Sequence, residues 1–362
     1  MNVSPSVASA ALKRILIVRL SSMGDITHAL PAVAMVREAF PDATLGWAVE
    51  ERWMELLCAP YYPSSGPRSP QRPLVDRIHP VNLKRWRATL FSNQTWERIA
   101  AGLSHLRAER YQVALDLQGA ARSAVLARWS GAASVYGAVQ PRENIASMWY
   151  TTKVMAQGKH VIEQYCSIAQ ALTGRAVPIP SAQFPEDLRA DEAVQQRLSA
   201  LGTDQFAVLS PGAGWGAKQW PAERYGEVAK AVASAGLRSI INFGPSEEAL
   251  ARVAESASAG AAVAMSFSLS ELIALMRRAR LFIGGDTGPM HLAAALKIPV
   301  VAIFGPTDPA RNGPFGTRNV VLRSPASRTS LTHRHEPDPG LLAISPMQVI
   351  KAARELLEST HA

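Results

Sequence analysis

Residues 281–295 read LFIGGDTGPMHLAAA, an apolar run, a short polar turn and a second apolar run. The pattern predicts a buried strand that ends at an acid, a hydroxyl and a glycine, followed by a helix that begins near Pro289. Backbone N–H groups and the helix dipole then converge on one spot that suits an anion. His291 would lie one turn into this helix. We interpret the stretch as a site for a diphosphate.

The same alternation of apolar strand and amphipathic helix extends outward over the whole chain. Strands are predicted at 15–19, 44–49, 77–81, 113–117, 206–210, 239–243, 281–284 and 300–304. Such alternation is typical of α/β proteins with doubly wound parallel sheets, in which ligands bind at the carboxyl ends of the strands.

The strand pattern restarts at Phe206, after a proline-rich polar crossing at 177–187. We therefore predict two Rossmann-like domains that face each other across a cleft, residues 1–185 and 186–345. A helix is predicted in the C-terminal segment, 346–362, and packing of this helix against the first domain is one possibility that the sequence leaves open. The segments 62–73 and 329–339 are predicted to be surface loops.

Composition describes a folded protein of the cytoplasm. The chain has 362 residues, of which 48% are apolar and 19% charged, and this length favours two domains. Its apolar runs are shorter than the roughly 20 residues that span a bilayer, and no secretory signal is visible. Two cysteines, Cys58 and Cys166, lie far apart without metal-type spacing, which suits a reducing compartment.

The net charge of +9 favours an anionic partner, although charge that serves only solubility explains it equally well. Nucleic acid is excluded as the partner because the chain has no recognised nucleic-acid-binding motif. Basic residues cluster at 84–87, and Arg122 and Arg142 join them in the first half. Arginine pairs bidentately with phosphate or carboxylate, so this set suits a multiply anionic ligand. Solvated surface charge remains the alternative for Lys84 and Arg87.

Asp25 follows the first predicted strand, at the position where the sheet delivers side chains to the cleft. Its place beside a helix start is expected to keep it ionised, and helix capping is the alternative role. This first turn lacks the G-x-G-x-x-G pattern of dinucleotide-binding enzymes, which argues against a dehydrogenase.

The loop at 210–221, SPGAGWGAKQWP, follows the first strand of the second half. Its three glycines let the backbone approach a ligand, and Lys218 supplies a mobile cation that suits phosphate. No Ser or Thr follows the lysine, so the loop is not a Walker A motif. A solvated lysine in a flexible loop is the alternative.

Three further groups complete the predicted anion site. Glu247 follows a strand end, where an acid can hydrogen-bond ribose, although helix capping is an alternative for it. Asp286 would repel a diphosphate directly, so we expect it to orient Lys218 or to hold backbone amides. Thr287 and Gly288 can donate their N–H groups to phosphate. For His291 a hydrogen bond to phosphate or sugar and a buried structural role both stay open.

Taken together, these residues resemble glycosyltransferase family 9, and within it the lipopolysaccharide heptosyltransferase I branch. The matching motifs are 21–25 with His28 and Pro31, 47–51, 85–87, 116–119 with 122–124, 142–143 with 146–147, 218–221, 286–288 with His291, and 305–309. Their order and spacing cover about residues 15–325.

The resemblance implies a GT-B fold, with acceptor binding in the first domain and donor binding in the second. It implies an inverting transfer from ADP-L-glycero-D-manno-heptose to the Kdo of Kdo2-lipid A, an anionic lipid, with no obligatory cofactor or metal. Because the acceptor is a lipid, we expect peripheral contact with the cytoplasmic face of the inner membrane. Heptosyltransferase II, another ADP-sugar transferase of the family and a non-catalytic nucleotide-sugar-binding protein stay open as alternatives.

Carried over residue by residue, the resemblance makes Asp25 the catalytic base and gives Lys218 a role at the leaving diphosphate. It implies donor-binding roles for Gly212, Ala213, Lys218, Glu247, Phe267, Asp286, Thr287, Gly288 and His291, and acceptor-binding roles for Arg85, Gln118, Arg122 and Arg142. One departure stands out. Gly212 and Ala213 occupy positions where heptosyltransferase I enzymes can present threonine hydroxyls, so these contacts would have to come from backbone amides.

Overall fold

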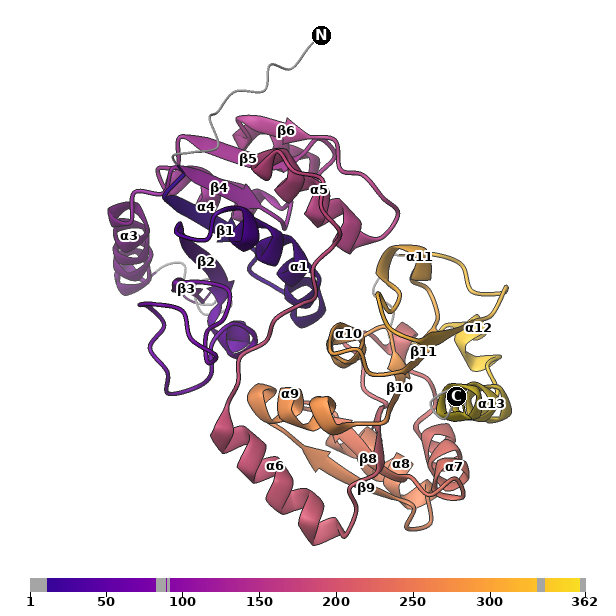
Figure 1. Ribbon diagram of the computed structural model, residues 1–362. Helices are drawn as coiled ribbons and strands as arrows, with labels where there is room; N and C mark the ends of the chain where they lie inside the picture. Colours follow the sequence, from indigo (N-terminus) through magenta and orange to yellow (C-terminus); the bar gives the residue numbers. More distant parts are fainter. Residues whose placement is uncertain (1–11, 83–88, 90–91, 331–335, 359–362) are drawn as a thin grey trace. The chain divides into compact units, whose positions relative to one another are not determined.

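The computed structural model describes residues 12–82, 89, 92–330 and 336–358, and the chain divides into two units, Met1–Glu186 and Asp187–Ala362. The division falls inside the predicted crossing, one residue from the predicted boundary (Figure 1). Among the described residues, no helix is both long enough and apolar enough to cross a membrane.

The first unit is built on a six-stranded parallel sheet with the order β3-β2-β1-β4-β5-β6. Its elements are β1 (Arg14–Val18), α1 (Met23–Ala39), β2 (Thr44–Glu50), the 3-10 helix η1 (Glu51–Leu56), β3 (Arg77–Val81), α3 (Asn93–Ala108), β4 (Val113–Asp116), α4 (Ala121–Trp129), β5 (Ser134–Ala138), the 3-10 helix η2 (Asn144–Trp149), β6 (Thr152–Val154) and α5 (Val161–Thr173).

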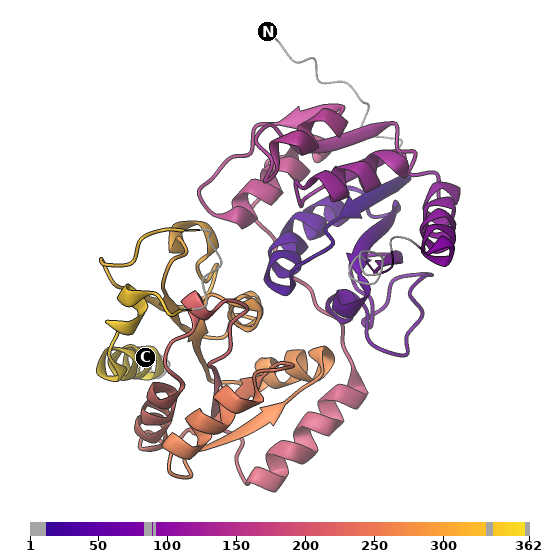
Figure 2. The ribbon, with the colours of Figure 1, turned by 180° about the vertical axis from the view of Figure 1, so that it is seen from behind.

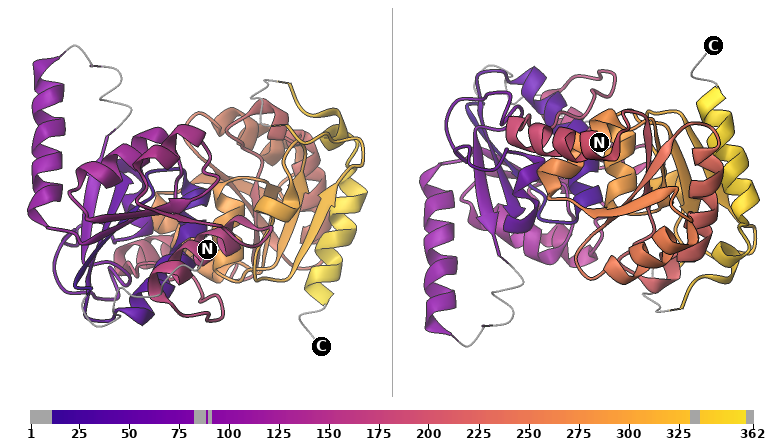
Figure 3. Two further views of the ribbon diagram at one scale, coloured as in Figure 1. Left: turned by 90° about the horizontal axis from the view of Figure 1, so that it is seen from above. Right: turned by 90° about the horizontal axis from the view of Figure 1, so that it is seen from below.

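Alternation along β1 explains how helices cover this sheet. Leu16 and Val18 pack in one core cluster with Ala124 and Ala127 of α4, because every second side chain of a strand points to the same face. α1 and α5 pack against each other on the opposite face, and α3 stands at the outside of the unit (Figures 1 and 3).

The second unit repeats this plan, with the strand order β12-β11-β10-β7-β8-β9. Its elements are α6 (Leu188–Leu201), β7 (Phe206–Ser210), the 3-10 helix η3 (Gly216–Lys218), α7 (Ala222–Ala233), β8 (Arg238–Phe243), α8 (Glu248–Ala257), β9 (Ala262–Ser266), α9 (Leu269–Arg278), β10 (Leu281–Gly285), α10 (Gly288–Ala295), β11 (Val300–Phe304), α11 (Pro309–Asn312), β12 (Asn319–Arg323), α12 (Pro339–Leu342) and α13 (Pro346–Glu358).

One face of the second sheet carries α7, α8 and α13, which share a core cluster with β7, β8, β10 and β11. α6 and α9 lie side by side in this unit, as the view from behind also shows (Figure 2). The C-terminal helix α13 packs in the second unit. The sequence had left packing on the first domain open for this helix. Its Val349, Ala352 and Leu356 are buried in that core, and Trp220 Nε1 donates to Ile344 O at 2.9 Å just before it.

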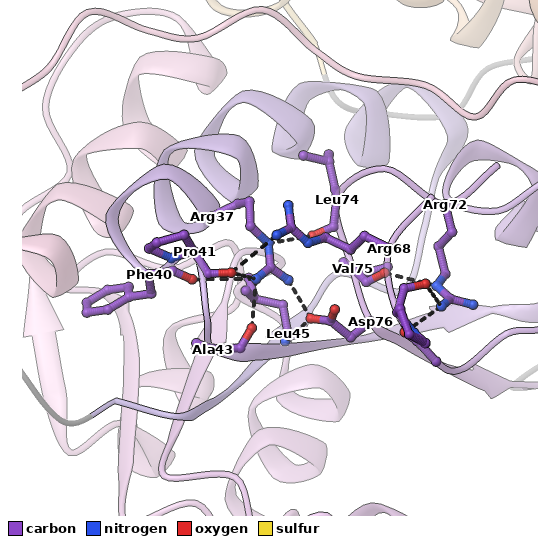
Figure 4. Close-up of polar contacts among 12 residues, drawn as sticks. Arg37, Phe40, Pro41, Ala43, Leu45, Arg68, Arg72, Leu74, Val75 and Asp76 are labelled. Carbon is purple, nitrogen blue, oxygen red and sulfur yellow. Dashed lines mark hydrogen bonds and ion pairs between the residues drawn. The ribbon is translucent and has the colours of Figure 1, made fainter. Parts of the chain in front are cut away.

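The segment 62–73 is ordered from within by a buried arginine (Figure 4). Arg72 is 1% exposed, and its guanidinium donates to the backbone oxygens of Pro63, Gly66, Pro67 and Val75. Close by, Arg37 pairs with Asp76, whose carboxylate also accepts from Leu45 N at 2.8 Å. The segment is a surface loop, as predicted, and apart from Arg72 its residues are exposed or half-buried. Arg68 also donates to Pro41 O at 3.3 Å, just after α1.

Candidate functional site

Both sheets have the strand order 3-2-1-4-5-6 when each is counted from its own first strand. In such sheets ligands bind at the carboxyl edge where the order reverses, which is between β1 and β4 in the first unit and between β7 and β10 in the second. Asp25 and Gln118 follow β1 and β4, whereas Lys218 and Asp286 follow β7 and β10. The predicted site residues thus concentrate at the two switch points.

In the second unit, Lys218, Asp286 and His291 form one cluster. Lys218 Nζ lies 2.6 Å from Asp286 Oδ2 and 3.2 Å from its backbone oxygen, and His291 Nε2 lies 3.1 Å from Asp286 Oδ1. Asp286 is buried, and the Lys218 side chain is 15% exposed. Of the two roles expected for Asp286, the orientation of Lys218 is the one that these contacts support.

The Asp286 carboxylate is strongly stabilised in its ionised form. Burial by itself would raise its pKa, but the hydrogen bond from His291 and the charges of His291 and Lys218 outweigh burial and hold the pKa well below its usual range. An ammonium group has three N–H donors, and Asp286 accepts from two of them. Lys218 also lies 4.6 Å from the ring centre of Trp215. It can therefore stay anchored while it binds an additional anion.

α10 begins directly after this cluster. Thr287 is its N-cap residue with extended backbone angles, Gly288 is its first residue, and Pro289 occupies the position where a missing N–H costs nothing. The Thr287 side chain makes no capping hydrogen bond and instead donates to Gly285 O at 3.4 Å. The first amides of the helix remain available to an anion, as the sequence predicts.

Gly212 and Glu247 are in close contact across the ends of β7 and β8. A Cβ atom on Gly212 would clash with the Glu247 carboxyl group, and Gly244 N donates to Glu247 Oε2 at 2.8 Å. Glu247 occupies the N-cap position of α8 but makes no side-chain capping hydrogen bond, and its contact with ribose stays a prediction. Ala213 is buried next to Gly212. The lack of a side chain at Gly212 lets an acid reach the switch point.

Phe267 lies at the end of β9, two strands away from β7. Its ring faces the Arg197 guanidinium at 5.1 Å, and Arg197 NH1 donates to Ser266 O at 2.9 Å. The structure does not bring Phe267 into the Lys218 cluster. Its predicted contact with the nucleoside stays a prediction.

In the first unit, Asp25 is held from two sides. Its Oδ1 lies 2.6 Å from Arg19 NH2, and its Oδ2 accepts from the backbone and hydroxyl of Ser22 at 3.0 Å each. Ser22 is the N-cap residue of α1 and Asp25 is the third residue of a capping box, so Asp25 is not itself the N-cap. The side chain of Asp25 is still 34% exposed, which leaves it accessible to a ligand.

Arg19 is a residue that the sequence analysis missed. Its side chain is 3% exposed, and NH1 donates to Leu117 O at 2.9 Å while NH2 holds Asp25. The available signal in the sequence is a charge that directly follows four apolar strand residues, 15–18. A cation at this buried position fixes the carboxylate of the predicted base.

Gln118 belongs to a buried polar network below the acceptor side of the site. Its Oε1 accepts from Leu20 N at 2.8 Å, and its buried Nε2 has no hydrogen-bond partner among the described residues. Asp116 accepts from the hydroxyl of Tyr150 at 2.7 Å, and from the amides of Gln118 and Gly119. Burial raises the pKa of Asp116 despite these hydrogen bonds. This network fixes the loop that carries Gln118.

Arg122 and Arg142 lie beside this loop. Gly119 has φ +69°, and a Cβ on it would contact the backbone N of Arg142 at 2.9 Å. Arg142 is exposed, and Arg122 is half-buried. The fold thus joins three of the four predicted acceptor residues, and the fourth, Arg85, lies outside the described residues.

Within the described part of the chain, no group of three or more His, Cys, Asp or Glu side chains has an arrangement that could hold a metal ion. The absence of an obligatory cofactor stays a prediction from the resemblance.

Comparison with known proteins agrees with this geometry. Residues 100–340 match the family model described as glycosyltransferase family 9 (heptosyltransferase). The chain belongs to glycosyltransferase family 9. It is 31% identical to lipopolysaccharide heptosyltransferase 1 of Escherichia coli K12, over 86% of this chain and 94% of the relative. It is also 31% identical to the protein of that name from Pseudomonas aeruginosa, over 86% and 84% of the two chains.

Solved structures of family 9 share the fold. The E. coli heptosyltransferase WaaC with ADP has a TM-score of 0.75 and 27% identity, with 95% of this chain and 99% of that chain covered. E. coli heptosyltransferase II, with a TM-score of 0.74 at 20% identity, supports the fold alone. The family 9 protein therefore has the predicted GT-B fold class and is a glycosyl-transferring enzyme. The alternative of a non-catalytic nucleotide-sugar-binding protein is not supported.

Proposed function

We propose that this enzyme transfers L-glycero-D-manno-heptose from ADP-heptose to the Kdo of Kdo2-lipid A, with inversion at the anomeric carbon. The observation that carries the proposal is the Lys218–Asp286–His291 cluster at a Rossmann switch point of a family 9 chain. The relatives named heptosyltransferase 1 support the choice of sugar and acceptor.

The leaving-group side of the reaction belongs to the second unit. As the bond between the anomeric carbon and ADP breaks, negative charge develops on the diphosphate. Lys218 and the amides at the start of α10 neutralise it, and one well-placed donor of this kind contributes about 3–4 kcal/mol. Asp286 takes no part in the bond changes, because its carboxylate is committed to Lys218 and His291.

The acceptor side belongs to the first unit. Asp25 accepts the proton of the attacking sugar hydroxyl as the new glycosidic bond forms, and Arg19 and Ser22 hold the carboxylate in place. Arg122 and Arg142 supply cations for an acidic acceptor, and a lipid acceptor implies peripheral contact with the inner membrane. Water would otherwise hydrolyse the donor, so both substrates have to be bound before transfer.

The test incubates purified protein with ADP-heptose and either Kdo2-lipid A or its mono-heptosylated form. Product mass and ADP release are measured. Transfer to Kdo2-lipid A alone supports the proposal, whereas transfer to the mono-heptosylated lipid alone would identify a heptosyltransferase II. If another ADP-sugar is used and ADP-heptose is not, the proposed donor is wrong. A Lys218→Ala protein, which should retain its fold and lose most turnover, controls for contaminating activity.

A further inference from the structure

An apolar cavity of about 140 Å³ lies in the first unit between α3, α4 and the carboxyl ends of β1, β2 and β3. Its aliphatic walls include Leu20, Val81, Leu103, Leu106 and Leu126. An apolar cavity of this size accommodates a hydrocarbon group about as large as benzene. Trp129 also lines the cavity and is 46% exposed, so the cavity reaches the surface at an amphipathic side chain.

α3 covers this cavity with few contacts of its own. Of its sixteen residues, Thr95 and Leu106 alone are buried. Gly102 lines the cavity, and a Cβ placed on it would meet no atom within 4 Å. The helix stands at the outside of the unit (Figure 3). The space beneath it can therefore accept a ligand without displacing a packed side chain.

Among the described residues, Arg122 is the only charged side chain that lines the cavity at neutral pH. The other titratable group is His79, and burial together with the charges of Arg77 and His105 lowers the pKa of its ring to about 4. The buried Nε of Arg122 has no hydrogen-bond partner in the described part of the chain. A buried guanidinium N–H without an acceptor costs free energy, so an anion bound beside Arg122 would be stabilising.

The cavity shares a wall with the predicted acceptor residues. Leu20 lines it, and the amide of Leu20 donates to Gln118 Oε1 at 2.8 Å. Gln118 in turn keeps a buried Nε2 without a partner among the described residues. One molecule can thus meet the polar groups of the loop after β4 and the hydrocarbon walls beneath α3.

We propose that this cavity binds a hydrocarbon segment of an acyl chain of the lipid acceptor, while Arg122 pairs with an acidic group of the same molecule. The proposal rests on the proposed function in taking the acceptor to be an acidic lipid. The charge of Arg122 and the apolar walls together select an acidic amphiphile over a free sugar acid, which would leave the hydrocarbon walls uncovered.

The test fills the cavity and compares two acceptors. Gly102→Phe adds a ring at an exposed helix position that lines the cavity, and it also removes a helix-weakening glycine. Ala101→Phe is the matched control, because this exposed neighbour points about 100° away around the same helix. Each protein is assayed in one detergent with acylated Kdo2-lipid A and with the same glycan after complete removal of its acyl chains.

We expect Gly102→Phe to raise KM for the acylated acceptor at least tenfold, and to leave KM for the chain-free glycan and for ADP-heptose within twofold of wild type. Ala101→Phe should change none of the three. Equal effects of Gly102→Phe on both acceptors, or equal KM values of the wild type for both, would overturn the inference. If the wild type transfers heptose to neither acceptor, the proposed function fails instead.

A binding measurement is independent of catalysis. Decanoate, decanol and inorganic phosphate are titrated separately into wild type, Gly102→Phe and Arg122→Gln, and binding is measured by titration calorimetry. Decanoate should bind wild type at least tenfold more tightly than either variant, and decanol should bind wild type and Arg122→Gln alike. Phosphate, which the Lys218 cluster can also bind, should bind all three proteins alike. Decanoate binding that survives Gly102→Phe unchanged would place the hydrocarbon elsewhere and refute the proposal.

Discussion

Replacing Asp286 by asparagine keeps the shape of the side chain and removes its charge. In the wild type the carboxylate binds Lys218 at 2.6 Å and His291 at 3.1 Å. Hydrogen bonds to charged groups contribute about 1.5–3 kcal/mol each and neutral ones about 0.5–1.5, so two weakened contacts cost about 2–3 kcal/mol. The full loss of about 3–5 kcal/mol for a broken buried pair is not expected, because Lys218 keeps a backbone oxygen and the Trp215 ring.

The matched control is Asp191→Asn in the same unit. Asp191 pairs with Arg278 at 2.9 Å, but both side chains are about 30% exposed, at 28% and 33%. Exposed pairs of this kind contribute about 0–1 kcal/mol. The same chemical change should therefore have a much smaller effect at this position, and the difference between the two variants measures what burial adds.

The effect of Asp286→Asn depends on pH in a defined direction. Burial acts to raise the pKa of Asp286, but His291 and Lys218 lower it further than burial raises it. A depressed folded pKa contributes stability above the unfolded pKa of about 3.9, and this contribution is lost as pH falls through the folded value. The part of the difference that comes from the ionisation of Asp286 should be constant above about pH 5 and shrink below about pH 4.

Native-state hydrogen exchange of the β10 and α10 amides gives the local free energy of opening for this part of the second unit. Titration calorimetry should also show that ADP binds the variant about tenfold more weakly, because Lys218 loses its anchor. If these amides are as well protected in Asp286→Asn as in wild type, or if Asp286→Asn lowers stability no more than Asp191→Asn does, the buried cluster does not have this energetic role.

Three further substitutions test separate parts of the site. Asp25→Asn should lower kcat at least a hundredfold with the donor affinity unchanged, as expected for loss of a general base; near-normal transfer would remove Asp25 from this role. Gly212→Ala should displace the flexible Glu247 carboxylate and cost about 0.5–1.5 kcal/mol in urea unfolding through the lost hydrogen bond from Gly244 N, and it should add no further cost to a Glu247→Ala protein. Gly119→Ala adds a backbone clash to a left-handed φ, so it should cost more in urea unfolding than Gly174→Ala, where φ is +65° but the surrounding space is open.

Much of the fold is visible in the sequence because the central strands are continuous apolar runs. All eight predicted strands are present, with ends within one residue of those predicted. The four strands that the sequence did not indicate are β5, β6, β9 and β12, which lie at or next to the edges of the two sheets. These four strands are partly exposed, so they need no unbroken apolar run and resemble loops in composition.

The site was predictable where strand ends bring loop residues together, and not where a contact depends on the packing of other elements. Lys218, Asp286 and His291 each follow a strand end, and parallel topology alone brings those ends together. The pairing of Asp116 with Tyr150 joins residues 34 positions apart through folded packing that no local pattern records. Arg19 was missed for a different reason, since a strand-terminal charge does not show that its side chain turns toward the following helix.

The division into two units has a consequence for identifying ligands. Each unit has its own buried cluster, so heating the full chain is expected to give two calorimetric transitions instead of a single Tm. A ligand stabilises only the unit that binds it, by about 2.7 kcal/mol at a hundred times its Kd. ADP should then raise one transition and an acceptor glycan the other. Unmodified protein and a calorimeter are enough to assign each substrate to its half of the chain.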